Sequence, residues 1–241
     1  MKLAGSTVGV GKDLRYHTVE LLRLYRGLMK YREIAELVKI PPPVIWRYIT
    51  FKILPSYERA RDVVKILTSR EVVSNILRRY VRFKEGAIDT SNVFSNVLLL
   101  KILAYVAYYS FSDVDVVLTV ELDGVPIATL VADLFKSRLA ISRKGIPFTS
   151  DIVYEAEYVS RDPPSIVRLY LPSSDLKKGE RVLIVDDLIR TGKTTVTLIK
   201  LIRNVEATLT GIFSPIAVGS AWRETLKNHQ SAIVTVLNIE E

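Results

Sequence analysis

The sequence predicts an α/β protein in which an all-helical N-terminal region precedes a sheet flanked by helices. Two short, β-branched apolar runs, residues 114–120 and 182–185, are typical of buried strands, and a helical pattern of apolar residues follows each. Residues 13–83, in contrast, repeat apolar side chains at helical spacing. A length of 241 residues and a hydrophobic share of 49% are ample for two such regions and their cores.

Three helices are expected within the first 55 residues. The apolar periodicity predicts one over residues 13–30 and a short second one over residues 31–39. In the second helix Ile34, Ala35, Leu37 and Val38 can pack inward. A third helix can begin near Pro42, because proline is tolerated in the first helical turn, where its missing N–H has no intrahelical partner anyway.

This succession resembles the helix-turn-helix of transcription regulators. Ala35 stands where the two helices of such a motif approach closely, Ile40 closes the turn, and Ile45 with Tyr48 or Ile49 faces the core. One position departs from the motif: Lys39 occupies a turn position that often holds Gly.

The third helix is then the expected recognition helix, and its outward residues are Pro43, Trp46, Arg47 and Thr50. Arg47 is the best candidate to read guanine, because its guanidinium can bond two acceptors in the major groove. The other basic residues are expected to bind phosphates without reading sequence. They are Lys30, Arg32, Lys39 and Lys52.

The charge distribution agrees with a partner that carries phosphates. Residues 1–85 contain 18 Lys and Arg against 8 Asp and Glu, a net charge of +10. Residues 86–241 contain 16 against 18, a net charge of −2. A basic N-terminal third on a near-neutral body is typical of a protein that binds a nucleic-acid backbone. We therefore expect double-stranded DNA as a partner.

Three segments follow from these patterns. Residues 1–55 are the expected DNA-binding domain, residues 56–88 a helical linker or dimerisation segment, and residues 89–241 the second domain. In the middle segment Ser69 can cap a helix whose apolar stripe needs a partner surface. That surface is either the N-terminal module or a second copy of the chain.

The most informative stretch follows the second predicted strand. Asp186 and Asp187 stand at the strand end, and a small-residue loop, residues 191–195, opens into a helix over residues 196–202. Backbone N–H groups at a helix start bind anions, and paired carboxylates can hold vicinal hydroxyls or a divalent metal. The Gly-Lys-Thr triplet at 192–194 also suggests a phosphate loop of the Walker type. That pattern requires Gly five residues before Gly192, where Asp187 stands.

Residues 185–194, Val-Asp-Asp-Leu-Ile-Arg-Thr-Gly-Lys-Thr, resemble the phosphoribosyl pyrophosphate (PRPP) motif of type I phosphoribosyltransferases, although the family usually has Gly where Lys193 stands. Upstream, Glu-Leu-Asp-Gly at 121–124 matches the family's pyrophosphate loop. Arg143 and Lys144 end a third strand, and a flap over residues 144–152 follows. Residues 153–160 and 165–171 read as a hairpin-like insertion. Within and after it, residues 158–160, 171–174 and 177–180 are similar to bacterial purine-operon repressors and xanthine phosphoribosyltransferases.

The resemblance implies a type I phosphoribosyltransferase fold with a mostly parallel sheet. It also implies that Asp186 and Asp187 hold the ribose hydroxyls, that residues 191–195 hold the ribose phosphate, and that residues 121–124 hold a diphosphate bridged by Mg²⁺. The implied ligand-binding residues are Glu121, Leu122, Asp123, Gly124, Arg143, Lys144, Asp186, Asp187, Arg190, Thr191, Gly192, Lys193, Thr194 and Thr195. Trp222 either stacks on a base or packs in the core.

Composition excludes several other classes. The absence of cysteine excludes disulfides, thiol catalysis and thiolate metal sites, and His17 and His229 belong to no metal-ligand pattern. The most apolar run, residues 97–109, is too short for a membrane span and is interrupted by Lys101. The first residues do not follow a signal-peptide pattern. We therefore expect a cytoplasmic protein with no membrane partner.

Together the sequence predicts a transcription regulator, similar to archaeal PRPP-type regulators. A helix-turn-helix would bind promoter DNA as a homodimer, and a phosphoribosyltransferase-like domain would sense PRPP or a purine nucleotide without catalysis. The first alternative is an active purine phosphoribosyltransferase that joins PRPP to a base, since enzyme and sensor need the same phosphate and ribose contacts. A second alternative is a nucleotide-regulated subunit of a larger assembly that does not contact DNA.

Overall fold

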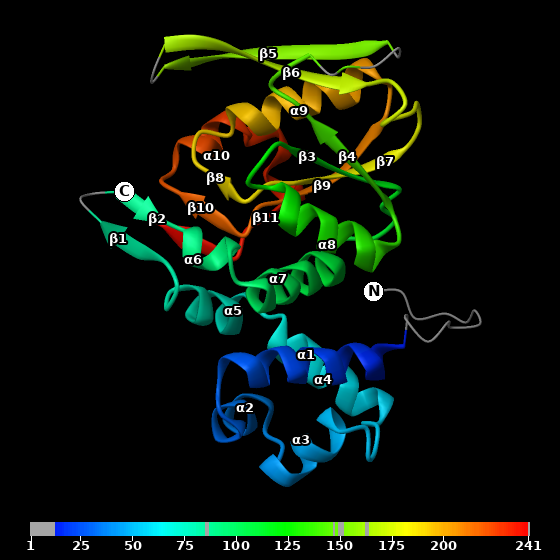
Figure 1. Cartoon of the computed structure of the whole chain (residues 1–241), viewed down its shortest axis with the longest axis vertical. Coiled ribbons are helices and arrows are strands. Elements are labelled where there is room, and N and C mark those ends of the chain that lie inside the picture. The colour runs from blue at the N-terminus through cyan, green and yellow to red at the C-terminus, as the bar shows by residue number, and fades with distance from the viewer. Residues whose placement is uncertain (1–12, 85–86, 147, 149–151, 162–163, 241) are drawn as a thin grey trace. The chain divides into compact units, whose positions relative to one another are not determined.

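The computed structural model describes residues 13–84, 87–146, 148, 152–161 and 164–240 (Figure 1). The chain divides into two compact units, Met1–Asn75 and Ile76–Glu241. The division falls within the segment, residues 56–88, that was expected to connect the two domains. The predicted fold class is confirmed: an all-helical region precedes a parallel sheet flanked by helices.

The first unit consists of helices: α1 (Leu14–Leu28), α2 (Tyr31–Val38), α3 (Pro42–Ile49), α4 (Tyr57–Leu67) and most of α5 (Arg70–Leu77). Helix α1 packs against α2, α3 and α4. Asp13 caps α1 by accepting a hydrogen bond from the backbone N–H of Arg15, 2.9 Å away. The hydroxyl of buried Tyr25 donates to the carbonyl of Leu67, which ties α1 to the end of α4.

The second unit contains twelve described strands and five described α-helices. The helices are α6 (Ser91–Phe94), α7 (Val97–Ser110), α8 (Val125–Phe135), α9 (Lys193–Asn204) and α10 (Ala221–Thr225), with a 3₁₀ helix at Lys227–Ala232. The strands are β1 (Arg82–Lys84), β2 (Ala87–Asp89), β3 (Val116–Val120), β4 (Arg138–Ser142), β5 (Val153–Arg161), β6 (Pro164–Pro172), β7 (Arg181–Val185), β8 (Leu188–Ile189), β9 (Thr208–Phe213), β10 (Ile216–Val218), β11 (Ile233–Val234) and β12 (Leu237–Ile239).

The central sheet has the strand order β11-β9-β7-β3-β4, and every pair in it is parallel. All five residues of β3 are buried, as expected of a strand covered on both faces. The chain leaves β3 through α8 toward β4, and leaves β7 through α9 toward β9, in the opposite direction. Right-handed crossovers then place α8 and α9 on opposite faces, as Figure 1 shows. The carboxyl ends of β3 and β7 therefore border the crevice where such sheets bind ligands.

An ion pair holds the opposite ends of these two strands. The guanidinium of Arg181, at the start of β7, donates to the carboxylate of Asp115, just before β3, at 2.7 Å. These hydrogen bonds lower the pKa of Asp115 to about 2. The pair secures the β3–β7 register, on which the spacing of the crevice depends.

Two further features frame the crevice. Strands β5 and β6, of nine residues each, pair antiparallel and pack on α9, which confirms the predicted hairpin-like insertion. Strands β8, β10 and β12 form a separate parallel sheet. The apolar run at residues 232–237 is divided between the two sheets: β11 extends the central sheet, whereas β12, which begins at Leu237, joins the smaller one.

The apolar helix α7 is a core element of the second unit. Eight of its fourteen residues are buried, and it packs against α8. Nowhere in the described residues does a helix reach the combination of length and hydropathy needed to cross a membrane.

Gly211 on β9 provides a test of this packing, because the ring of Phe111, at the end of α7, lies directly against it. A methyl group at this position would overlap the ring. We expect Gly211→Ala to lower the free energy of unfolding by about 1–3 kcal/mol, measured by chemical denaturation. Gly145→Ala is the matched control, since its methyl group would meet no atom within 4 Å, and its effect should stay within about 0.5 kcal/mol. Equal effects of the two substitutions would contradict the packing.

Candidate functional site

The two acidic loops predicted from the sequence meet at the crevice. Gly124, in the turn after β3, lies against Asp186, which follows β7: a Cβ at Gly124 would be 3.4 Å from a carboxylate oxygen of Asp186. The same Cβ would be only 2.5 Å from the Thr119 hydroxyl oxygen. Glycine is therefore required for this approach, and the two motifs form one site.

Three neighbouring carboxyl groups, those of Asp123, Asp186 and Asp187, give the crevice a negative electrostatic potential. The side chains of Asp186 and Asp187 are half-buried. Desolvation raises the pKa of Asp186 well above its usual value, and the negative charges of Asp187 and Asp123 raise it further. Desolvation likewise raises the pKa of Asp187, and Asp123 adds to it. Such a pair is costly to ionise, and donors from a polyhydroxyl ligand or a cation would offset that cost.

The site suits a hard cation held mainly by a bound ligand. No group of three or more His, Cys, Asp or Glu residues with metal-binding geometry is found in the described part of the chain. Mg²⁺ is nevertheless commonly bound through one or two carboxylates, with water and substrate phosphates completing its octahedron. Asp186, Asp187 and Asp123 offer such carboxylates, and the ion would supply positive charge to bridge phosphate oxygens.

The predicted diphosphate loop is tied to the predicted basic strand end. The carboxylate of Glu121 accepts a hydrogen bond from the backbone N–H of Lys144 at 2.8 Å. The Glu121–Leu122 peptide bond is cis, and Leu122 is exposed. Arg143 exchanges two backbone hydrogen bonds with Tyr170, and the side chains of Arg143 and Lys144 are exposed. Of the predicted flap, residues 147 and 149–151 lie outside the described residues.

The ribose-phosphate loop is shorter than the sequence indicated. Helix α9 begins at Lys193 rather than near residue 196, so Lys193, Thr194 and Thr195 form its first turn. The reason is Gly192, whose φ of +74° lets the chain turn directly into the helix. The first N–H groups of a helix have no intrahelical acceptor, which makes this turn suited to an anion. Arg190 and Thr191 precede the turn and are exposed.

Lys193, the residue that departs from the family pattern, connects this turn to the β5–β6 hairpin. Its ammonium group donates to the backbone carbonyl of Val159 on β5 at 2.7 Å. One residue later, the Thr194 hydroxyl lies 3.4 Å from the hydroxyl of Tyr158. A glycine at position 193 could not make the first contact. The hairpin is therefore attached to the residues expected to hold the ribose phosphate.

Trp222 packs in the core rather than facing a ligand. It is 6% exposed, and its indole N–H donates to the carbonyl of Gly219 at 3.1 Å. Leu226, at the end of α10, lies against Gly192, so this segment supports the anion turn from behind.

The predicted DNA-binding side chains are all exposed on the first unit. They are Arg32, Lys39, Pro43, Trp46, Arg47, Thr50 and Lys52. Ile40 and Ile45 are buried as expected, and the third core-facing residue is Tyr48, whereas Ile49 is half-buried. Ala35 and Leu37 are also only half-buried, because the buried face of the short helix α2 consists of Ile34 and Val38.

The turn between α2 and α3 forms without glycine. Lys39 adopts φ of +55° and ψ of +41°, the left-handed conformation that Gly usually supplies at a helix end. The Thr50 hydroxyl donates to the Trp46 carbonyl at 2.8 Å, at the other end of α3. Arg23 of α1 donates to the carbonyl of Ile49 at 2.9 Å and so fixes the end of the expected recognition helix.

Three residues of these sites have contacts that were not identified from the sequence, although the segment of one of them, residues 158–160, was singled out by resemblance. Thr119 carries a buried hydroxyl that has no hydrogen-bond partner among the described residues and adjoins Gly124. The sequence did offer one signal for Thr119, since it is the one polar residue of the otherwise apolar strand β3. Tyr158 and Arg23 act through contacts between distant segments, and no local pattern could reveal them.

A parallel sheet with an acidic pair and the start of a helix at its switch point is an arrangement suited to a phosphorylated ligand. Comparison with known proteins specifies the family: residues 89–239 match the phosphoribosyl transferase domain, and the chain belongs to this family.

Relatives in the family include both regulators and enzymes. The chain is 34% identical over 130 residues to the probable purine biosynthesis transcriptional regulator PurR of Streptococcus pneumoniae, covering 53% of this chain and 47% of that protein. It is 30% identical over 143 residues to the hypoxanthine/guanine phosphoribosyltransferase of Methanosalsum zhilinae, covering 59% of this chain and 72% of that enzyme. The chain thus spans about half the length of the PurR relative.

Solved structures show the same fold. The adenine phosphoribosyltransferase of Giardia lamblia superposes with a TM-score of 0.61 at 17% identity, and the match covers 72% of this chain and 99% of the enzyme.

Asp186 permits a test of the electrostatics. Its folded pKa is raised, so the ligand-free chain loses stability as the pH rises from about 3.8, the ordinary value, through the folded pKa. We expect Asp186→Asn to raise the free energy of unfolding at pH 7 by about 1 kcal/mol while PRPP binding is lost. Denaturation curves at pH 4 and pH 7, with calorimetric titration of PRPP, measure both effects. A lower free energy of unfolding for Asp186→Asn at pH 7 would contradict a raised pKa of Asp186.

Lys193 permits a test of the hairpin attachment. We expect Lys193→Met to increase hydrogen exchange in β5 and β6 by roughly 2–10-fold, the effect of losing one net hydrogen bond. Lys200→Met is the control, since Lys200 is exposed on the same helix and its ammonium forms no hydrogen bond or ion pair with another described residue. The attachment would be refuted if both variants exchanged like the unmodified chain.

Proposed function

We propose that the chain is a DNA-binding transcription regulator whose phosphoribosyltransferase-type domain senses PRPP or a purine nucleotide. The observation that carries this proposal is that more than a quarter of this chain lies outside the enzyme fold. The match to the phosphoribosyltransferase of Giardia lamblia covers 99% of that enzyme but only 72% of this chain. The family match begins at residue 89, and Met1–Asn75 forms a separate basic helical unit. The similarity to PurR, itself described as a transcriptional regulator, supports the same conclusion.

The first unit would bind DNA through α3. Trp46 and Arg47 are exposed on this helix, and Arg47 makes no recorded ion pair or hydrogen bond through its guanidinium with another described residue. Its fork is therefore available for a guanine edge in the major groove. Lys39 and Lys52 flank the helix and would contact phosphates. A homodimer would place two such helices on half-sites about one helical turn apart.

The second unit would bind the ligand at the switch point. Asp186 and Asp187 would accept hydrogen bonds from the ribose hydroxyls, and the first turn of α9 would donate N–H groups to the ribose phosphate. The loop after β3 would hold the diphosphate with Mg²⁺, and Arg143 and Lys144 would add positive charge beside it. PRPP and a purine nucleotide share the ribose phosphate, so either one fits this description.

Lys193 supplies a route by which ligand binding changes structure. Its ammonium already bonds the Val159 carbonyl, and a phosphate in the adjoining turn would compete for the same charge. Ligand binding would then loosen the hairpin from α9. A ligand shifts a conformational equilibrium only by its differential affinity for the two states, and this competition is a source of such a difference.

The alternative is a working phosphoribosyltransferase. The identity to the hypoxanthine/guanine phosphoribosyltransferase of Methanosalsum zhilinae, with 72% of that enzyme covered, favours it. An enzyme and a sensor would share every contact described for the ribose phosphate.

One experiment separates the two functions. Fragments of the source organism's genomic DNA are selected by the purified chain, with and without PRPP and Mg²⁺, and the same preparation is assayed for turnover of PRPP with purine bases. The regulator predicts enrichment of a palindromic promoter site that changes with PRPP, and no turnover. Turnover with a base and no sequence enrichment would replace the proposal with the enzyme.

Two variants of the first unit distinguish reading from positioning. We expect Arg47→Gln to weaken binding to the selected site by about 1–3 kcal/mol while leaving non-specific binding nearly unchanged. Lys52→Gln should weaken specific and non-specific DNA alike and reduce the salt dependence by about one charge. Fluorescence anisotropy over a salt series measures both. The same behaviour in the two variants would contradict α3 as the reading helix.

A further inference from the structure

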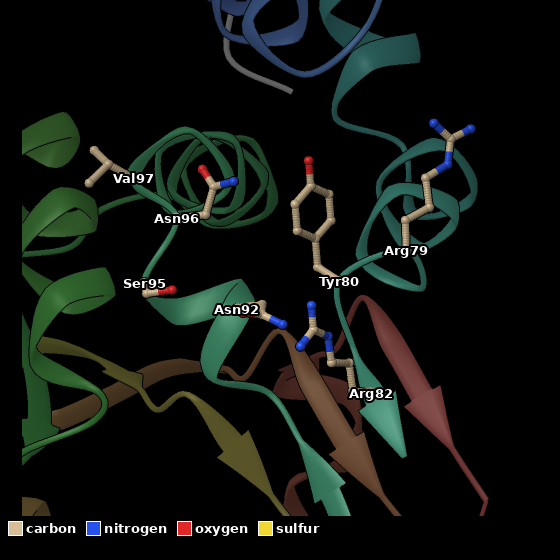
Figure 2. A pocket seen from close by; sticks show the side chains of 7 residues that line it. All are labelled: Arg79, Tyr80, Arg82, Asn92, Ser95, Asn96 and Val97. Carbon is tan, nitrogen blue, oxygen red and sulfur yellow. The ribbon is translucent and has the colours of Figure 1, made fainter. Parts of the chain in front are cut away.

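The second unit contains a cavity of about 590 Å³ that shares no residue with the ribose-phosphate site. One wall is formed by the segment after α5, with Arg79, Tyr80 and Arg82, and the other by α6 and the start of α7 (Figure 2). Turn hydrogen bonds from the N–H groups of Arg79 and Tyr80 to the carbonyls of Ile76 and Leu77 shape the first wall. The cavity is thus built on ordered backbone.

Apart from Val97, every described side chain that lines this cavity can donate a hydrogen bond, and none of them is a carboxylate. Figure 2 shows Tyr80 between Asn96 and Arg79, and Arg82 pointing toward Asn92. Neither Arg79 nor Arg82 forms an ion pair with another described residue. Figure 2 shows the Arg79 guanidinium directed away from both asparagines, so Arg82 is the cation that faces the amides. A guanidinium without an ion pair among the described residues, beside amide and phenol donors, is suited to an anion with several oxygens.

Helix α7 adds to this character. Its first turn contains no acidic residue, so its positive end is not neutralised. Asn96 caps the helix: its side-chain oxygen accepts from the N–H groups of Leu98 and Leu99 at 3.0 and 3.4 Å. Because the oxygen is engaged by the helix, the amide nitrogen of Asn96 is the group left to donate toward the cavity.

We propose that this cavity is a second phosphate-binding site of the chain. Arg82 would pair with the phosphate oxygens, Tyr80, Asn92 and Asn96 would donate hydrogen bonds to them, and Arg79 would add positive charge at the rim. The proposal does not depend on whether the chain is a regulator or an enzyme, because the cavity involves neither α3 nor the crevice. The phosphate belongs either to a free phosphorylated compound or to a nucleic-acid backbone.

Two variants of the full chain test the site, with a third as control. Arg82→Gln removes one guanidinium from the cavity. Asn96→Asp keeps a good helix cap but places a negative charge at the cavity, so its fold is expected to be preserved. Arg78→Gln removes the same charge from the same short segment, yet Arg78 lines a different cavity, next to Phe83 and Leu237.

The two sources of phosphate are measured separately. Calorimetric titration with inorganic pyrophosphate should show two binding events for the unmodified chain. If the source is a free compound, Arg82→Gln and Asn96→Asp should weaken one event by about tenfold or more, and Arg78→Gln should not. If the source is a nucleic-acid backbone, the first two variants should instead reduce the salt dependence of duplex binding by about one charge.

Either pattern supports a phosphate site in the cavity, and both together would show that it accepts both sources. Unchanged binding in Arg82→Gln and Asn96→Asp would overturn the proposal. Equal losses in Arg78→Gln would also overturn it, because they would indicate diffuse surface charge rather than a built site.

Discussion

The close approach of Gly124 to Asp186 is the constraint on which the rest of the second unit depends. It brings the turn after β3 against the residue after β7 and so creates a crevice at the switch point of the sheet. The same approach holds Asp186 beside Asp187 in surroundings that oppose ionisation. At the far edge of these strands, Arg181 and Asp115 fix the register that makes the approach possible. The ion pair at the amino ends of β3 and β7 thus supports a site at their carboxyl ends whose carboxylates are costly to ionise.

The site combines a family-wide arrangement with a local departure. The acidic pair, the turn at Gly192 and the start of α9 would suit any protein that holds a ribose phosphate. Lys193 is the departure. Where the family usually has a glycine, this chain has a lysine whose ammonium reaches the β5–β6 hairpin. A charge committed to a neighbouring element in the ligand-free chain suits a sensor, in which binding must change structure.

Positive charge is used differently in the two units. In the first, cations surround an exposed short helix whose own residues include only Arg47 as a charged group. In the second, Arg79 and Arg82 border a cavity that no described carboxylate lines. Neither Arg47 nor Arg79 and Arg82 forms an ion pair with another described residue, and these groups are therefore suited to external phosphates.

The sequence by itself determined the fold class, the main strands of the central sheet with their helices, and the acidic and glycine motifs, but not the short strands β1, β2, β8 and β10. These follow from local patterns: buried strands are short and β-branched, and helix starts carry small residues and glycine. The outward positions of α3 also followed, because helical periodicity decides which residues can face solvent. What the tertiary structure decided were contacts between distant segments, among them Lys193 with Val159, Gly211 with Phe111, and the cavity beside Arg82. Local periodicity specifies which side of an element is buried, but the partner it meets is selected by packing across the whole chain.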